Sequence, residues 1–236
     1  MRKFLLALLG LGGIALAAFL IFGPAWFDKQ TNMVDGKPLP EIRAEAQELH
    51  DSLMIVDLHG DTLLWKRKIT DNVDYGHIDL DRLEAGNVGL QIFSSVTKTP
   101  KGQNYDSNSG DTDNITLLAI TQLQPVRTWF SLLERQLYHA QKLDKAVAAS
   151  GGRLASISQP AHLDRLDKSI GVLFSAEGLQ TLEGDRANLK KLYASGMRMA
   201  GLVHFFDNEL AGSMHGMEKG GLTEFGRTIV RDMEQM

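Results

Sequence analysis

The stretch from Met54 to Asp61 reads Met-Ile-Val-Asp-Leu-His-Gly-Asp, a short apolar run that ends abruptly in polar groups. Such a run predicts a buried β-strand at residues 54–58. Because side chains alternate between the two faces of a strand, Asp57, His59 and Asp61 are expected on the same face. An imidazole and a carboxylate two residues apart can bind one metal ion. A lone histidine at a strand end is more often structural than a ligand, so the pair carries the prediction of a metal site.

Two later apolar runs also end in residues that can bind a metal or a substrate. Residues 170–176 lead into Glu177, and residues 198–203 lead into His204. Both runs are bounded by turn residues, as strands are. Taken alone, Glu177 could be a surface carboxylate and His204 a core histidine.

Helical and extended segments alternate along the rest of the chain. This alternation predicts a mostly parallel sheet covered by helices, an α/β fold. Polar groups after several strands favour a (β/α)8 barrel of the TIM type, and an open doubly wound sheet is the alternative. Further strands are expected at 88–95 and 154–157, and helices at 42–53, 79–85, 114–150 with a break near Pro125, 158–166, 185–195 and from Thr223 onward.

The composition is that of an ordinary globular protein, with 43% hydrophobic and 23% charged residues in a chain of 236. The formal net charge is −4, and the Lys and Arg residues are scattered. We therefore expect no nucleic-acid partner and no basic field that attracts an anionic membrane surface. Cysteine is absent, so any metal must be bound by His, Asp and Glu.

The N-terminus predicts export. Residues 4–23 are apolar or glycine, and a helix of this length spans roughly 30 Å, the thickness of the hydrocarbon core of a bilayer. We expect residues 1–23 to be an uncleaved membrane anchor, with a cleaved signal peptide as the alternative. Arg2 and Lys3 place the rest of the chain outside the cytoplasm, periplasmic or extracellular, by the positive-inside rule. Residues 24–40 are expected to be a polar linker, and residues 41–236 the barrel domain.

Four runs of sequence carry a resemblance to a known family. They are Val-Asp-Leu-His-Gly-Asp-Thr at 56–62, Phe-Ser-Ala-Glu-Gly at 174–178, Gly-Met-Arg-Met-Ala-Gly-Leu-Val-His-Phe at 196–205 and Gly-Gly-Leu-Thr-Glu-Phe-Gly-Arg at 220–227. Each run alone is a weak motif. In this order and spacing they resemble the N-terminal part of the membrane dipeptidase (renal dipeptidase) family of zinc peptidases.

This resemblance implies the roles of the candidate residues. His59 and Asp61 would bind one Zn²⁺, and Glu177 would bridge it to a second. A hydroxide that bridges the two metals would attack the peptide bond of a dipeptide substrate. His204 would contact the substrate and stabilise the oxyanion. Asp57 would orient His59 or close a buried ion pair, and the resemblance also allows a homodimer.

The chain also departs from the family pattern. The family takes two further histidines for its second zinc, downstream of the Leu-Thr-Glu-Phe-Gly run, and this sequence stops at Met236. A barrel needs about 250 residues, so we expect a chain truncated after roughly half of its barrel, with at most one metal and without activity of its own. The alternatives are an inactive anchored binding module and a related metal-dependent amide or lactam hydrolase.

We expect the other histidines and the polar loop to lie outside the metal group. His215 lies in a glycine-rich loop where the family places no ligand. The remaining histidines, at positions 50, 77, 139 and 162, are expected to be solvated. The polar loop at 97–114 is a candidate rim or lid of the site.

Overall fold

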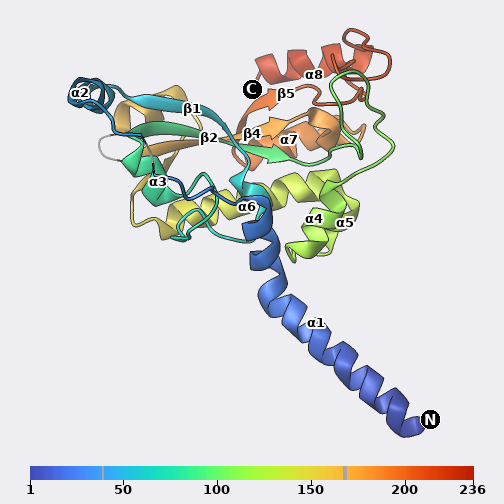
Figure 1. Ribbon diagram of the computed structural model, residues 1–236. Coiled ribbons are helices and arrows are strands. Elements are labelled where there is room, and N and C mark those ends of the chain that lie inside the picture. The colour runs from blue at the N-terminus through green and yellow to red at the C-terminus, as the bar shows by residue number, and fades with distance from the viewer. Residues whose placement is uncertain (39, 167–168) are drawn as a thin grey trace.

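The structure is a computed structural model that describes residues 1–38, 40–166 and 169–236, and Figure 1 shows an α/β domain from which one long helix protrudes. Five strands and eight α-helices, with three short 3₁₀ helices, make up the described part of the chain. The elements are α1 (Arg2–Thr31), α2 (Ala44–Ser52), β1 (Ile55–Gly60), η1 (Thr62–Leu64), α3 (Leu80–Ala85), β2 (Val88–Val96), α4 (Ile115–Thr121), α5 (Arg127–Phe130), α6 (Leu132–Ala149), β3 (Leu154–Ser156), η2 (Pro160–Arg165), β4 (Ile170–Glu177), η3 (Leu179–Leu182), α7 (Ala187–Ala194), β5 (Met197–Gly201) and α8 (Glu224–Glu234).

The five strands form one parallel sheet, and each lies within three residues of its predicted position. The strand order is β1-β2-β4-β3, and β5 joins the same edge of β4 farther along, beyond β3. Apart from the short β3, which pairs with the start of β4, the strands follow the chain order β1, β2, β4, β5 across the sheet. A doubly wound sheet reverses its order at a switch point, whereas a barrel does not. The prediction of a barrel-type α/β fold is confirmed.

Strand β1 differs from the buried strand that its sequence predicts. Among the described residues it pairs only with β2. Val56 and Leu58 are 40% and 63% exposed. An apolar run therefore does not ensure burial, because burial also requires an element that covers the strand.

The hydrophobic core lies between the sheet and its helices. Helix α6 packs against β2, β3 and β4, and α7 packs against β5 and α6 (Figure 1). Leu143 of α6, Leu192 of α7 and Phe174 of β4 are buried members of this core. Helix α8 joins it through Ile229, which is fully buried. The apolar face of this C-terminal helix thus packs on the core.

Local sequence signals predict where helices begin and end better than they predict which helices are buried. The Asp79 side chain accepts a hydrogen bond from the Arg82 N–H at the start of α3, as an N-cap does. The predicted break near Pro125 is confirmed, because α4 ends at Thr121 and α5 begins two residues after the proline. Helix α2 forms within the predicted range 42–53 and has no buried residue.

Helix α1 is longer than the predicted anchor. It continues through Pro24 to Thr31, into the segment that was expected to be a linker. Asp28 on its last turns is 1% exposed and pairs with Arg67 at 3.1 Å. Residues 24–31 are therefore a docked end of α1, which corrects the prediction of a polar tether there.

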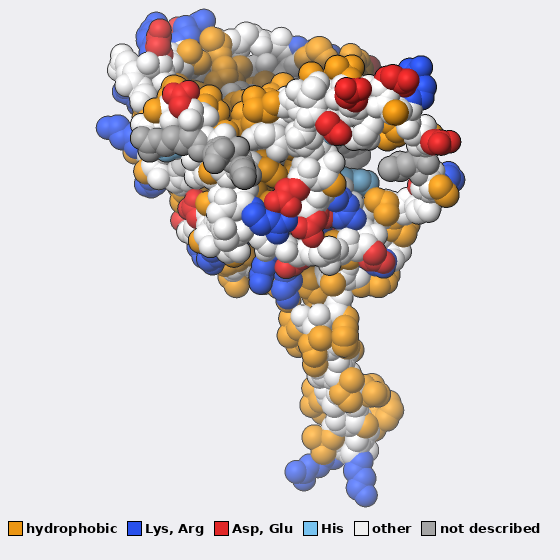
Figure 2. Space-filling view, turned by 90° about the vertical axis from the view of Figure 1, so that its left-hand side faces the viewer, with side chains coloured by type: hydrophobic (Ala, Val, Ile, Leu, Met, Phe, Trp, Pro, Cys, Tyr) orange, Lys and Arg blue, Asp and Glu red, His pale blue; other side chains and the backbone are white. Residues whose placement is uncertain are grey.

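The protruding part of α1 is apolar on all sides. By length and composition it could cross a membrane, as an anchor or as a signal sequence. Figure 2 shows hydrophobic side chains along this part and basic side chains at its tip, where Arg2 and Lys3 occur in the sequence.

Candidate metal centre

The carboxyl ends of three parallel strands bring the predicted site residues together. His59 is the next-to-last residue of β1, Glu177 is the last residue of β4, and His204 follows β5. Asp61 is the N-cap residue of η1, directly after β1. Parallel strands end at the same edge of a sheet, and for this reason residues far apart in the sequence meet here.

His59, Asp61 and Glu177 form a compact group. Each offers one ligand atom, and these atoms lie within 4.8 Å of one another. His59 Nε2 is 3.2 Å from Asp61 Oδ1 and 3.5 Å from Glu177 Oε2. The structure thus places the three predicted ligands together, and their metal-binding role stays a prediction.

The two carboxylate oxygens of Glu177 face different imidazoles. Oε2 faces His59, and Oε1 lies 2.8 Å from His204 Nε2. His204 is 16% and Glu177 20% exposed at the side chain, so both line a partly shielded site. One carboxylate therefore connects the predicted metal group to the predicted substrate contact.

Several polar atoms of the site are buried and lack a hydrogen-bond partner. They include Asp61 Oδ1, Glu177 Oε2 and His204 Nδ1. Burial raises the pKa of Asp61, and the negative charge of Glu177 raises it further. Two buried carboxylate oxygens without donors are costly unless a cation satisfies them. Nitrogen and carboxylate oxygen donors are also the donor types of zinc sites without cysteine, so the residues fit this metal.

Local contacts hold the end of β1 in place. Asp57 Oδ1 accepts a hydrogen bond from the His59 main-chain N–H at 3.1 Å. Asp57 thus fixes the backbone that carries the ligand, where an ion pair or a contact with the imidazole had been expected. Gly60 is buried, and a Cβ atom there would lie 2.6 Å from Ile78 Cδ1. A side chain at Gly60 would therefore require the Ile78 side chain to move.

The loop after His204 is built by hydrogen bonds to side chains. The Asp207 carboxylate accepts from the main-chain N–H groups of Ser213 and Glu218, at 2.7 and 2.8 Å. These and other main-chain N–H groups lower the pKa of Asp207, although partial burial acts in the opposite direction. Gly216 is required here, since its Cβ atom would lie 1.9 Å from Asp207 Oδ1. Asp207 thus organises the loop that follows His204.

An aromatic cluster beside His204 was not predicted. The Phe205 ring contacts the His204 ring at a centroid distance of 4.3 Å and stacks on His215 at 5.1 Å. His215 Nδ1 lies 2.7 Å from the main-chain oxygen of Tyr105, which belongs to the polar loop at 97–114. His215 is outside the metal group, as expected. The sequence signal for the cluster is weak, because it joins segments about 100 residues apart.

The other histidines do not all behave as expected. His77 is exposed, and His50 and His162 are partly buried. His139 was expected to be solvated but is fully buried, and its Nδ1 lies 2.8 Å from Ser95 Oγ. Burial holds the pKa of His139 well below its usual value. The prediction was wrong because α6 presents this side to the sheet.

Sequence comparison identifies the family. The sequence model described as membrane dipeptidase (peptidase family M19) matches residues 43–236, most of the chain. The chain belongs to the membrane dipeptidase family. The resemblance found in the four sequence runs is thereby confirmed.

Individual members are distant relatives. The dipeptidase aclJ of Aspergillus oryzae is 28% identical over 199 residues, which cover 77% of this chain and 42% of that protein. The dipeptidase verJ of Clonostachys rogersoniana is 28% identical over 174 residues, which cover 70% of this chain and 39% of the relative. The chain thus spans less than half the length of these curated relatives.

Solved structures show the same fold. The probable dipeptidase PvdM from Pseudomonas aeruginosa superposes with a TM-score of 0.60 at 19% identity, covering 80% of this chain and 46% of the other. A metallopeptidase from Rhodobacter sphaeroides, solved with a phosphinate mimic of the dipeptide L-Ala-D-Ala, gives 0.57 at 18% identity, covering 78% and 56%. The sheet described above therefore corresponds to about half of the fold of these proteins.

Proposed function

We propose that the protein containing this chain is a zinc-dependent dipeptidase, attached to a membrane by α1, with its barrel domain outside the cytoplasm. Three observations together support the proposal. Three ligand atoms from two strand ends lie within 4.8 Å of one another, two of their carboxylate oxygens are buried without a donor, and the chain belongs to a dipeptidase family.

His59, Asp61 and Glu177 would hold the zinc. Three protein ligands leave one position open on a tetrahedral zinc, as catalytic zinc sites require. Bound there, zinc supplies a Lewis acid and lowers the pKa of a coordinated water. Glu177 also presents a second oxygen on the side of His204, which suits a carboxylate that bridges two cations.

His204 is proposed to contact the substrate. Its imidazole is next to Glu177, and the Ser213 hydroxyl donates to its main-chain oxygen, so the residue is held at the site from two directions. A fixed imidazole N–H can donate to the oxygen of an amide carbonyl as negative charge develops there. Dipeptides are the proposed substrates, including those with a D-residue.

Metal analysis of the full chain in detergent tests the ligand assignment. The described residues offer one group of three ligands, so we expect one zinc per chain after stripping and reloading. His59→Ala should lose this zinc, whereas His77→Ala, which removes an exposed histidine elsewhere, should keep it. Equal zinc content in the two variants would refute the assignment.

Activity assays separate the proposed reaction from its alternatives. A zinc-loaded protein that hydrolyses dipeptides supports the proposal, with His204→Ala lowering kcat while leaving the zinc content unchanged. Zinc-dependent hydrolysis of N-acyl amides or lactams instead of dipeptides would indicate a related hydrolase. Dipeptide binding without turnover would indicate a binding module. Assays of a longer protein that includes the other half of the fold apply the same criteria.

A further inference from the structure

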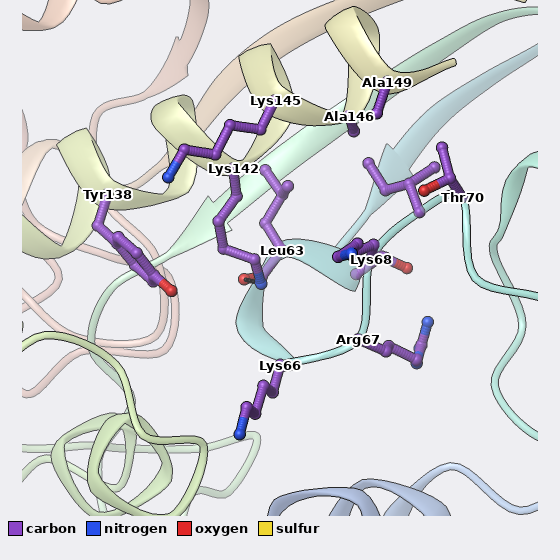
Figure 3. Close-up of a pocket in the computed structure, with 12 residues that line it drawn as sticks. Leu63, Lys66, Arg67, Lys68, Thr70, Tyr138, Lys142, Lys145, Ala146 and Ala149 are labelled. Carbon is purple, nitrogen blue, oxygen red and sulfur yellow. Dashed lines mark hydrogen bonds between the residues drawn. The ribbon is translucent and has the colours of Figure 1, made fainter. Parts of the chain in front are cut away.

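A basic pocket lies beside the docked end of α1, and none of the three predicted metal ligands lines it. It has a volume of about 340 Å³ and is formed by the segment after β1 and by one side of α6. Figure 3 shows five basic side chains around it, from Lys66, Arg67, Lys68, Lys142 and Lys145. No Asp or Glu lines the pocket among the described residues. Basic residues that look scattered in the sequence thus gather at one place.

Two of these cations are already bound by the protein. Arg67 pairs with the buried Asp28 of α1 at 3.1 Å. Lys142 Nζ donates to the main-chain oxygens of Leu63 (2.6 Å) and Trp65. Both side chains are therefore occupied by contacts within the protein.

The other three cations are available to a ligand. Lys66, Lys68 and Lys145 are exposed, and within the described chain their ammonium groups form no ion pair with a carboxylate. Like charges around a concave site focus a positive potential and attract anions. The volume is at the lower end of the range for small-molecule sites, which suits a compact anionic group.

The pocket is tied to the point where the apolar part of α1 ends. The Lys66 N–H donates to Gln122 Oε1, and Gln122 Nε2 donates to the main-chain oxygen of Pro24. The Trp65 ring lies 6.3 Å from the ring of Phe27. Pro24 directly follows the apolar run, and one helical residue advances by only 1.5 Å. If α1 spans a bilayer, the pocket lies at the level of the lipid headgroups.

We propose that this pocket binds the phosphate-bearing headgroup of an anionic lipid, so that the domain rests on the membrane in a fixed orientation. The inference depends on the proposed insertion of α1 and is independent of the proposed peptidase activity. A basic residue near an anionic membrane surface contributes about 1 kcal/mol, and three unpaired lysines around one pocket add to this contribution. The docked end of α1 holds the pocket there without a flexible tether.

The test uses the full chain in lipid nanodiscs, either of phosphatidylcholine alone or of equal parts phosphatidylcholine and phosphatidylglycerol. Co-elution of the chain with the discs after a high-salt wash reports insertion of α1. Lysine acetylation by a water-soluble reagent, read by mass spectrometry, then reports whether each amine is covered. We expect labelling of Lys66, Lys68 and Lys145 to be roughly fivefold slower in the anionic discs, the factor that corresponds to about 1 kcal/mol per lysine.

Two internal controls separate pocket binding from a general effect of surface charge. Lys29 is closer to the apolar run of α1, outside the pocket, and is paired with Asp74 at 2.7 Å. Lys190 is exposed on α7, away from the pocket. Neither should change its labelling more than about twofold between the two lipids.

A paired set of variants completes the test. Lys66→Gln with Lys68→Gln should abolish the protection of Lys145, whereas Lys101→Gln with Lys190→Gln removes the same charge elsewhere and should preserve it. Equal labelling of Lys145 in the two lipids would overturn the inference. Equal protection by inorganic phosphate in neutral discs would assign the pocket to a soluble anion and overturn the lipid assignment. Failure of the chain to stay with the discs would refute membrane insertion, and this inference with it.

Discussion

Strands β1 and β4 both deliver metal-ligand candidates, but they are built in different ways. Strand β4 pairs with β2 on one side and with β3 and β5 on the other, and it is buried along most of its length. Strand β1 pairs with β2 alone among the described residues, and half of its residues are exposed. Glu177 therefore takes its position from the core, whereas His59 and Asp61 depend on local contacts such as the hydrogen bond from Asp57.

This difference shows that a ligand can be positioned either by strand pairing on both sides or by local side-chain contacts. The sheet fixes Glu177 through main-chain pairing on both sides. In the segment after β1, side chains hold the main chain instead. Lys142 of α6 donates to two main-chain oxygens, and Gln124 Nε2 donates to the main-chain oxygen of Leu64. The substitutions below test whether core packing holds β4 and polar contacts hold β1.

The largest expected effect is on the core around β4. Phe174 is 4% exposed, so Phe174→Ala should lower the free energy of unfolding by about 3–5 kcal/mol through lost burial and a cavity. Leu58 on β1 is 63% exposed, and Leu58→Ala should change it by less than about 0.5 kcal/mol. Denaturant titration of both variants measures this difference. Similar losses in the two variants would show that β1 is as buried in solution as β4.

Metal affinity provides the next test. Glu177→Ala removes the ligand that β4 supplies and should weaken zinc binding by more than about 100-fold, beyond the cost of losing an outer hydrogen-bond partner. Glu177→Gln retains a neutral oxygen of the same size and should lie between wild type and alanine. Competition with a chelator measures the affinities. A Glu177→Ala protein that binds zinc like wild type would restrict the site to His59 and Asp61.

The sequence predicts those features that depend on neighbours along the chain. The alternation of Asp57, His59 and Asp61 and the strand ends at Glu177 and His204 are local patterns, and the structure brings the predicted ligands together. The predictions that β1 is buried and that His139 is solvated were wrong. Both properties depend on which elements lie opposite these residues in space.

The docked end of α1 and the basic pocket also could not be predicted from local sequence patterns. Asp28 and Arg67 form their ion pair across 39 positions, and the segment after β1 meets α6 across more than 70. A polar stretch after an apolar run is typical of a tether, and nothing local indicates that Asp28 becomes buried. Long-range contacts of this kind come from the fold as a whole.

The contact of Lys142 with the segment after β1 predicts a pH dependence of stability. Burial, and then the charge of Arg67, lower the pKa of Lys142 from 10.5 to about 7. Between these values the unfolded chain binds a proton that the folded chain does not, so the free energy of unfolding should rise with pH, by up to about 1.4 kcal/mol per unit. Below about pH 7 both states are protonated, and the dependence should flatten.

Lys142→Met isolates this contribution. The difference in free energy of unfolding between wild type and this variant should increase from pH 7 to pH 9, whereas Lys190→Met, at an exposed site, should show no such trend. A difference that stays constant with pH would mean that Lys142 keeps its ordinary pKa in the folded protein. The contact with the Leu63 and Trp65 oxygens would then involve a fully charged ammonium group.

The smallest expected effect is at Asp57, whose side chain accepts a hydrogen bond from the main-chain N–H of His59 in the same strand. Asp57→Ala removes the acceptor of the His59 N–H and should cost about 1 kcal/mol of stability, with about tenfold weaker zinc binding. Asp57→Asn keeps an acceptor oxygen at the same position and should retain most of both. If asparagine fails as alanine does, the negative charge of Asp57 matters more than its hydrogen bond. If alanine matches wild type, pairing with β2 suffices to place His59, and β1 needs no more local support than β4.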